Sequence, residues 1–369
     1  MDFMCANHTN TRRITMTRRE RVLAAIQHKE PDKVPKGEIG AGIDEQLIRQ
    51  LLDKDYDPSG TDDATFHNWK AVRELLHIDL VSVGLDLPPD EPTGELFHGH
   101  PVYRDGWGRT YIKAQGASRT VKPVLEDIRE VYNWEPPSLE NARTDTIRRW
   151  VEETDFFIFP CVNGAFEISY EILRFEDFMI WCHTCPREVE LWTEKITRHG
   201  AEAAKIAVEA GAHGIVIADD LAYNSGTMIA PEMLRSMIFP YLKWEVQQIK
   251  ELGVPVFLHT DGDINAIMQD IIEMGFDGTQ ALQPSAGMDI AQIKQDYGDR
   301  LCLMGNVDID LLGRGTPQQI EQAVKELIEV AAPGGGFILS SSNELGTETS
   351  VENALAMYRA GERYGVYEP

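Results

Sequence analysis

The sequence reads Val256-Phe-Leu-His-Thr-Asp-Gly-Asp263 in its second half, a short apolar run that ends abruptly in a histidine, two acids and a glycine. Buried parallel strands read as continuous apolar runs of this kind. The pattern recurs in three further segments, which are Ile215-Val-Ile-Ala-Asp-Asp220, Leu301-Cys-Leu-Met-Gly-Asn-Val-Asp308 and Phe337-Ile-Leu-Ser-Ser-Ser-Asn-Glu344. Several strands that all end in polar residues imply one shared pocket at their carboxyl ends.

Short apolar runs alternate with long helical segments from about residue 155 onward. With two upstream segments, the expected strands cover residues 34–40, 79–85, 156–162, 214–219, 256–259, 278–283, 301–306 and 336–341. Strands that alternate with helices predict an α/β fold of the (β/α)₈ (TIM) barrel type. An open doubly wound sheet is the alternative, but the glycine-rich turn that a dinucleotide-binding sheet needs after its first strand is missing.

The first part of the chain adds to the predicted barrel. Apolar residues at helical spacing predict helices over residues 18–28, 44–52 and 62–76, and Thr17-Arg-Arg-Glu20 is a capping box for the first of them. Residues 1–15 form a polar segment that we expect to be a flexible tail, so that residues 16–369 form one domain. Asp105-Gly106, between alternating residues, predicts an inserted β-hairpin.

Composition excludes several classes of function. The chain has 35 Lys and Arg against 60 Asp and Glu, a net charge of −25, which argues against binding to nucleic acid. No apolar run approaches the roughly 20 residues that span a bilayer, and residues 1–15 lack the apolar core of a signal peptide. Five cysteines, an odd number, favour reduced thiols. We therefore expect a cytoplasmic protein without membrane association.

The strand ends supply the candidate chemistry. His259 can serve as a metal ligand or as a general acid or base, and Asp261, two residues on, can face the same cavity. Asp263 reads more simply as a helix cap. Asp219 and Asp220 end another strand, where one can be catalytic or bind substrate while the other caps a loop.

Other polar residues near strand ends are weaker candidates for binding a substrate. Each can equally be a solvated or capping residue of a loop. They are Glu38, Asn163, Glu167, Tyr223, Asn306 and Asn343. Glu344, a lone acid in the short polar loop after the last strand, is more suggestive, although it can also be a solvated loop carboxylate.

The chain resembles the uroporphyrinogen decarboxylase superfamily, which includes cobalamin-dependent methyltransferases. The matching strings include Thr17-Arg-Arg-Glu-Arg-Val-Leu-Ala-Ala-Ile26, Phe239-Pro-Tyr-Leu242, His259-Thr-Asp-Gly262 and Pro333-Gly-Gly-Gly336. The resemblance covers nearly the whole chain. It implies a (β/α)₈ barrel with its site at the carboxyl ends of the strands, and it makes a homodimer reasonable.

Two departures from the family pattern bear on the reaction. The decarboxylase's arginine-rich segment corresponds to residues 37–44, which contain no arginine, and its late histidine corresponds to Asn343. The thiol methyltransferases of the superfamily bind zinc through His-x-Cys and a later cysteine, which correspond to His259-Thr-Asp261 and the vicinity of Asn343. Because zinc accepts carboxylate oxygen, a zinc site of His259, Asp261 and Glu344 is compatible with this pattern.

These observations lead to one main hypothesis and two alternatives. The main one is a corrinoid-dependent methyltransferase that moves a methyl group from a small methylated or methoxylated donor to a separate corrinoid protein, with His259, Asp219 and Asp220 as catalytic candidates. One alternative is a decarboxylase or lyase in which Asp219 or Asp220 is the acid. The other is a barrel that binds a ligand without catalysis.

Overall fold

The computed structural model describes residues 15–39, 42–114 and 117–367. All but the last residue of the expected tail therefore lies outside the described residues. Six strands form a parallel sheet in the order β14 (Phe337–Ser341), β13 (Cys302–Val307), β12 (Gly278–Ala281), β11 (Val256–Thr260), β8 (Ile215–Ala218) and β7 (Cys161–Asn163). Two further strands, β1 (Leu80–Val81) and β6 (Phe157–Ile158), pair in parallel with each other.

Backbone hydrogen bonds join these strands into a closed ring. The Gly37 amide donates to the Leu339 carbonyl (3.0 Å), and the Asp79 amide donates to the Lys36 carbonyl (2.7 Å), so the segment before Ile39 lies between β14 and β1. On the other side, the Phe159 amide donates to Val81 (2.9 Å), and the same chain segment continues into β7. This closure confirms the predicted barrel over the open sheet.

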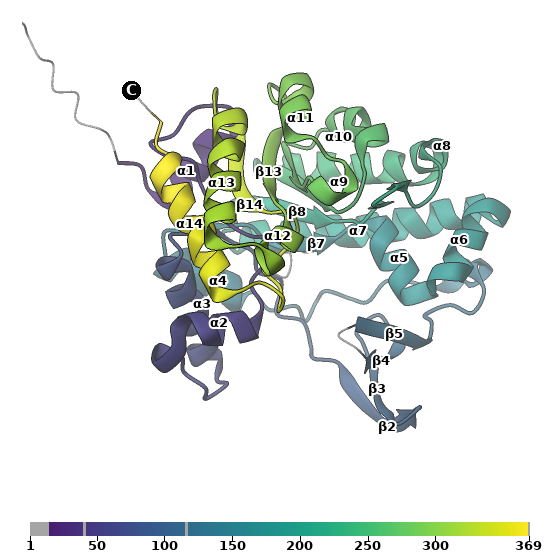
Figure 1. Cartoon of the computed structure of the whole chain (residues 1–369). Helices are drawn as coiled ribbons and strands as arrows, with labels where there is room; N and C mark the ends of the chain where they lie inside the picture. Colours follow the sequence, from purple (N-terminus) through teal and green to yellow (C-terminus); the bar gives the residue numbers. More distant parts are fainter. Residues whose placement is uncertain (1–14, 40–41, 115–116, 368–369) are drawn as a thin grey trace, which may run out of the picture.

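Helices surround the ring (Figure 1). Those that follow the barrel strands are α5 (Ala165–Leu173), α6 (Phe175–Thr184), α7 (Pro186–Glu209), α8 (Pro231–Met233), α9 (Phe239–Lys250), α10 (Met268–Met274), α11 (Ile290–Tyr297), α12 (Ile309–Arg314), α13 (Pro317–Ala331) and α14 (Val351–Tyr364). Those nearer the amino terminus are α1 (Arg18–Ile26), α2 (Glu45–Leu52), α3 (Asp62–Leu75) and α4 (Asp145–Glu153). Among the described residues no helix is both long and apolar enough to span a bilayer.

Alternation along the strands separates two cores. Phe257 belongs to an inner core, whereas its neighbours Val256 and Leu258 pack in the larger core shared with the helices. The inner core also contains Leu80, Phe157, Phe159, Val216, Cys302, Met304 and Ile338, with Val22, Ala25 and Ile26 of α1. Helix α1 therefore closes the amino-terminal end of the barrel, and the capping box predicted at Thr17 is present at its start. The carboxyl ends of the strands are left for a site.

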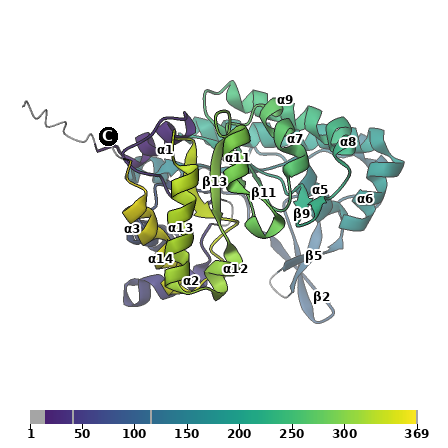
Figure 2. The ribbon, with the colours of Figure 1, turned by 45° about the horizontal axis from the view of Figure 1, so that its top comes forward.

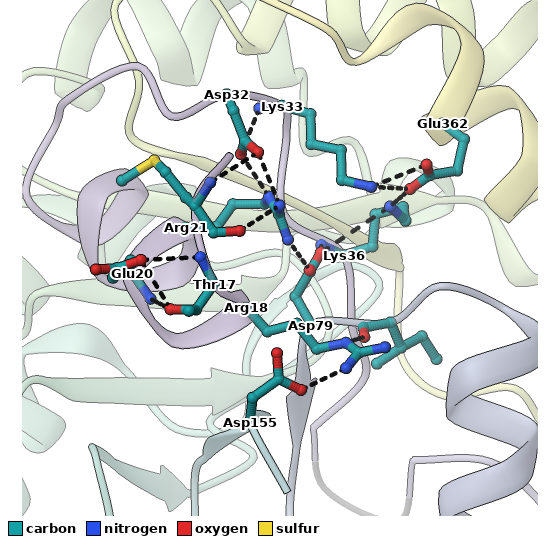
Figure 3. A network of polar contacts seen from close by, with 12 residues as sticks. Thr17, Arg18, Glu20, Arg21, Asp32, Lys33, Lys36, Asp79, Asp155 and Glu362 are labelled. Atoms are coloured by element: carbon teal, nitrogen blue, oxygen red, sulfur yellow. Dashed lines mark hydrogen bonds and ion pairs between the residues drawn. The ribbon is translucent and has the colours of Figure 1, made fainter. Parts of the chain in front are cut away.

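A buried ionic network stabilises that closed end (Figure 3). Arg21 of α1 pairs with Asp32 and with Asp79, which precedes β1. Lys36, fully buried, pairs with Glu362 of α14 and lies 3.9 Å from Asp79. The network ties α1, the first two strands and α14 together, and charged residues paired at this end of a barrel serve stability rather than chemistry.

An antiparallel sheet is inserted between the second and third barrel strands, and it projects from the body of the molecule (Figure 1). Its strands are β2 (Glu91–Phe97), β3 (His100–Arg104), β4 (Thr110–Ala114) and β5 (Ala117–Lys122), and we call this sheet the arm. The predicted hairpin is its β3–β4 turn, where the Asp105 amide donates to Arg109 (3.1 Å). Strand β2 was not predicted, because Pro92 and Gly94 interrupt the alternation of apolar and polar residues that indicates a strand.

Candidate active site

Three side chains from two neighbouring strands meet at the carboxyl end of the barrel. His259 lies in β11 opposite Ala218 of β8, so Asp261 and Asp220, each two residues further along, point the same way. One ligand atom from each of Asp220, His259 and Asp261 lies within 4.8 Å of the others. We call these residues the triad.

Gln280 of β12 orients the histidine. Its Nε2 donates to the Asn343 carbonyl (2.8 Å), an oxygen that can only accept, so its Oε1 faces His259 Nδ1. His259 must then donate through Nδ1, which leaves the lone pair of Nε2 free to bind a metal ion or a proton. Gln280 is fully buried and also donates to Ser340 Oγ (3.4 Å), so this orientation is held from three sides.

Asp220 is held by the backbone amide of Asp261, and Asp261 is held by the side chain of Asn343. Asp220 Oδ1 accepts the Asp261 amide (3.0 Å), and Asn343 Nδ2 donates to Asp261 Oδ2. Asp261 Oδ1 is buried without a hydrogen-bond partner among the described residues. Burial, opposed by His259 and reinforced by Asp220 and Glu344, raises the pKa of Asp261 to about 6.

The donor set fits a divalent metal ion. An imidazole nitrogen with a fixed tautomer and two carboxylates are ligands that Zn²⁺ accepts. A buried carboxylate oxygen that lacks a partner costs free energy unless a proton or a cation meets it. Asp261 Oδ1 is such an oxygen, and Gln280 and Asn343 supply the outer hydrogen bonds that metal ligands commonly have.

The triad opens into a cleft of about 550 Å³. Asp220, Asp261, Asn343 and Tyr223 line it, and Tyr223 is about half exposed at its rim. Among the described residues that line the cleft there is neither lysine nor arginine. The cleft therefore favours neutral or positively charged ligands over carboxylates.

A second group of acids lies behind the triad. Asp219, adjacent to Asp220, points away from the cleft, and its Oδ1 accepts the amides of Phe166 (2.8 Å) and Glu167 (2.7 Å) at the start of α5. Burial raises the pKa of Asp219 to about 7. Glu167 Oε2 accepts the Asp220 amide (3.3 Å), and burial, followed by the charges of Asp220 and Asp219, raises the pKa of Glu167 to about 8. Burial and like charge therefore favour the protonated form of Glu167.

The remaining candidates from the sequence lie at different distances from this site. Glu344 is half-buried and near enough to influence the pKa of Asp261, but it does not join the 4.8 Å group. Glu38 is buried and accepts hydrogen bonds from Ser340, Ser341 and Tyr358 outside the cleft. Asn306 is buried and donates to the Leu282 carbonyl (2.7 Å), and Asn163 is exposed at the end of β7.

Gln280 was not among the sequence candidates, although a signal for it exists. It stands in an expected strand two residues after Gly278, so it shares a face with an inward position. A lone amide at such a position needs partners inside the barrel. Asp263 precedes Ile264, the N-cap of the short helix Asn265–Ile267, and its Oδ1 accepts the Asn265 amide (3.1 Å) in the turn before that helix, so it holds the turn rather than the N-cap position.

Fold and site together define a (β/α)₈ barrel with an acidic, histidine-containing pocket at the carboxyl ends of its strands. Residues 106–364 match the family model described as uroporphyrinogen decarboxylase (URO-D), and the chain belongs to that family.

Curated relatives differ in the reaction they carry. The chain is 28% identical over 205 residues to a methylcobamide:CoM methyltransferase, MtaA, of Methanosarcina barkeri, covering 55% of this chain and 57% of the relative. It is 32% identical over 146 residues to a uroporphyrinogen decarboxylase of Chlorobium phaeovibrioides, covering 39% of each. The chain thus spans about half the length of the methyltransferase relatives it matches. A methyltransferase structure from Methanosarcina mazei shares the fold, with a TM-score of 0.73, 22% identity and coverage of 95% of this chain and 99% of that chain.

Proposed function

We propose that the protein is a corrinoid-dependent methyltransferase that moves a methyl group from a small methylated or methoxylated donor to a corrinoid carried by a separate protein. The observation that carries the proposal is the triad, which places Asp220, His259 and Asp261 together beside an open cleft. The similarity to a methylcobamide:CoM methyltransferase supports a corrinoid as one of the two methyl carriers, although in that relative's name methylcobamide is the methyl donor.

The triad would hold a divalent metal ion, such as zinc, through His259 Nε2 and oxygens of Asp220 and Asp261. When bound, such an ion acts as a Lewis acid toward a heteroatom of the donor. A nitrogen and carboxylate oxygens form a harder ligand set than thiolates, and hard sites suit oxygen donors better than thiols. This chemistry supports a methoxylated donor.

The protein's own residues supply what a poor leaving group needs. In the transfer, the bond between methyl and heteroatom breaks, its electron pair stays on the heteroatom, and the methyl group passes to the corrinoid. The heteroatom then needs a proton. Glu167, whose pKa is raised by burial and whose Oε2 accepts the Asp220 amide behind the triad, would be the nearest acid to supply it.

The charge of the cleft weighs against the alternative of tetrapyrrole decarboxylation. A substrate with several carboxylates would find no lysine or arginine to pair with among the described residues that line the cleft. Carboxylates therefore gain little electrostatic attraction from these residues. The cleft suits a donor that carries no negative charge.

The test is methyl transfer to free cob(I)alamin, followed by absorbance, with a panel of methoxylated and methylated small molecules. We expect turnover with at least one donor, and a loss of about 100-fold or more in kcat/KM for His259→Ala. His183→Ala is the matched control, because His183 is exposed on α6. Release of carbon dioxide without any methyl transfer would refute the proposal in favour of a decarboxylase, and tight ligand binding without turnover would favour a binding protein.

A further inference from the structure

The arm carries positive charge in a chain that is otherwise strongly negative. Residues 98–122 contain five Lys and Arg and one Asp, a net charge of 5 − 1 = +4, whereas the whole chain has −25. Lys113 and Lys122 are exposed and, among the described residues, take part in none of the ion pairs, although the Lys113 ammonium lies 5.8 Å from the centre of the Tyr103 ring. Strand β2 adds two acids, Glu91 and Glu95, so the positive charge is concentrated on β3 to β5.

The arm rests on helix α5, at the carboxyl end of the barrel. Arg109 Nη1 (3.2 Å) and Thr120 Oγ1 (2.6 Å) both donate to the Glu171 carbonyl of α5. Helix α5 starts directly after β7, at the carboxyl ends of the barrel strands. Both ribbon views place β5 next to α5, and in Figure 2 β9 (Ala222–Tyr223) lies close by.

Aromatic rings continue this contact to the rim. The Tyr170 ring of α5 lies 5.6 Å from that of Phe175, which lies 6.3 Å from the ring of Tyr223 at the cleft. The arm is thus a fixed neighbour of the cleft rather than a remote extension.

A corrinoid is large and, under the proposed function, arrives on another protein. That protein must cover the cleft to bring its corrinoid to the methyl donor, so it should also contact the arm, which projects beside the cleft. The cleft itself offers carboxylates, and the arm offers the opposite charge at its edge. Leu96, 71% exposed, and Phe97, 42% exposed, add apolar surface on β2.

We propose that the arm is the docking surface for the corrinoid protein, which it binds through an acidic face of that partner. This inference rests on the proposed function, and it names the partner's chemistry and the place where it sits. Charge complementarity of this kind steers association and fixes the orientation of the partner more than it adds affinity.

The experiment compares two methyl acceptors. One is free cob(I)alamin, and the other is a corrinoid protein purified from the source organism by its corrinoid absorbance. The variant Lys113→Glu/Lys122→Glu reverses two exposed charges of the arm, and Lys29→Glu/Lys54→Glu reverses two exposed lysines outside it, with the same change in net charge. Circular dichroism and thermal melting confirm that both variants fold.

We expect the arm variant to raise KM for the corrinoid protein about tenfold at low salt, an effect that shrinks as salt rises, because exposed charges are screened. Its transfer to free cob(I)alamin should equal that of the wild type, and the control variant should resemble the wild type with both acceptors. If the arm variant loses activity equally with both acceptors, or keeps full activity with both, the arm is not the docking surface, although the proposed methyl transfer still stands.

Two other outcomes also decide the matter. If the wild type transfers methyl to neither acceptor, the proposed function fails and this inference fails with it. If the wild type is a dimer by light scattering and the arm variant is a monomer, the arm binds a second copy of this acidic chain, and the proposed partner is wrong.

Discussion

Replacing Gln280 with methionine should weaken metal binding without touching a metal ligand. Gln280 is the acceptor that fixes the Nδ1 proton of His259, and methionine keeps a similar length but accepts hydrogen bonds only weakly. His259 would then sample the tautomer in which Nε2 carries the proton and binds no metal. Its ring would also lose the contact that sets its orientation toward Asp261.

The contacts of Gln280 indicate how large the losses in zinc affinity and in stability should be. Loss of an outer hydrogen bond to a metal-binding histidine costs about 10- to 100-fold in metal affinity, or roughly 1.4–2.8 kcal/mol. The same change removes the donor to the Asn343 carbonyl and to Ser340 Oγ. Because Gln280 is fully buried, this loss should lower the free energy of unfolding by a further ~1–3 kcal/mol. The two costs are measured separately.

The assay is competition for Zn²⁺ between the apoprotein and a chromophoric chelator at pH 7.5, with thermal melting of each apoprotein. Gln280→Glu is the discriminating variant, since a carboxylate keeps the acceptor for His259 and strengthens it, but loses the donor to Asn343. We expect Gln280→Met to lose affinity and Gln280→Glu to keep or gain it, while both melt lower. Equal zinc affinity in the wild type and Gln280→Met would refute the argument that this amide sets the histidine.

Three further changes test other parts of the structure. Burial alone would raise the pKa of Glu362, but the charges of Lys36 and Lys33 outweigh this effect and lower the pKa to about 2. The stabilisation is therefore complete above the unfolded value of 4.5 and is lost as pH falls toward 2, so Glu362→Gln should cost ~1–2 kcal/mol at pH 7, discounted for partial exposure, and almost nothing near pH 2 in urea titrations. Burial, and then the charge of Asp219, raises the pKa of Glu245 well above 4.5. The contribution of this acid to stability is therefore fully present below pH 4.5 and is lost as pH rises and the buried carboxyl ionises. The variant Glu245→Gln should melt higher than the wild type, by a margin that widens from pH 5 to pH 8. A Cβ on Gly164 would lie 2.2 Å from Asp219 Cβ, so Gly164→Ala should cost ~1–3 kcal/mol, measured by chemical denaturation, and a full-stability variant would contradict the packing there.

The strand ends could be predicted from the sequence because buried parallel strands are apolar until they reach the pocket. His259 and Asp261 share a face in any strand of period two, so their proximity needed no tertiary information. The choice between Asp219 and Asp220 did need it. Only the register of β8 against β11, in which His259 lies opposite Ala218, turns Asp220 inward and Asp219 toward the start of α5.

Features that depend on packing across the barrel could not be read from local patterns. The sequence suggested Glu344 as a third metal ligand, but Glu344 lies outside the 4.8 Å group, in which Asp220 is the third member because of the register of β8 against β11. Gln280 acts through contacts to β11 and to the loop after β14, both distant in sequence. Such contacts follow from closure of the ring, which a run of residue types does not specify.

The two ends of this barrel treat carboxylates in opposite ways, and the contrast argues for function at one of them. At the amino-terminal end, Asp32, Asp79 and Glu362 each pair with arginine or lysine. At the other end, Asp261 and Glu167 lie close to further acids, and burial with like charge raises the pKa of both. Repulsion of this kind lowers stability, and only a proton or a bound cation relieves it. Because the acids at the amino-terminal end are paired with lysine or arginine, the acids left without such partners at the carboxyl end are best explained by function. We interpret them as a site that binds a proton or a cation during the reaction.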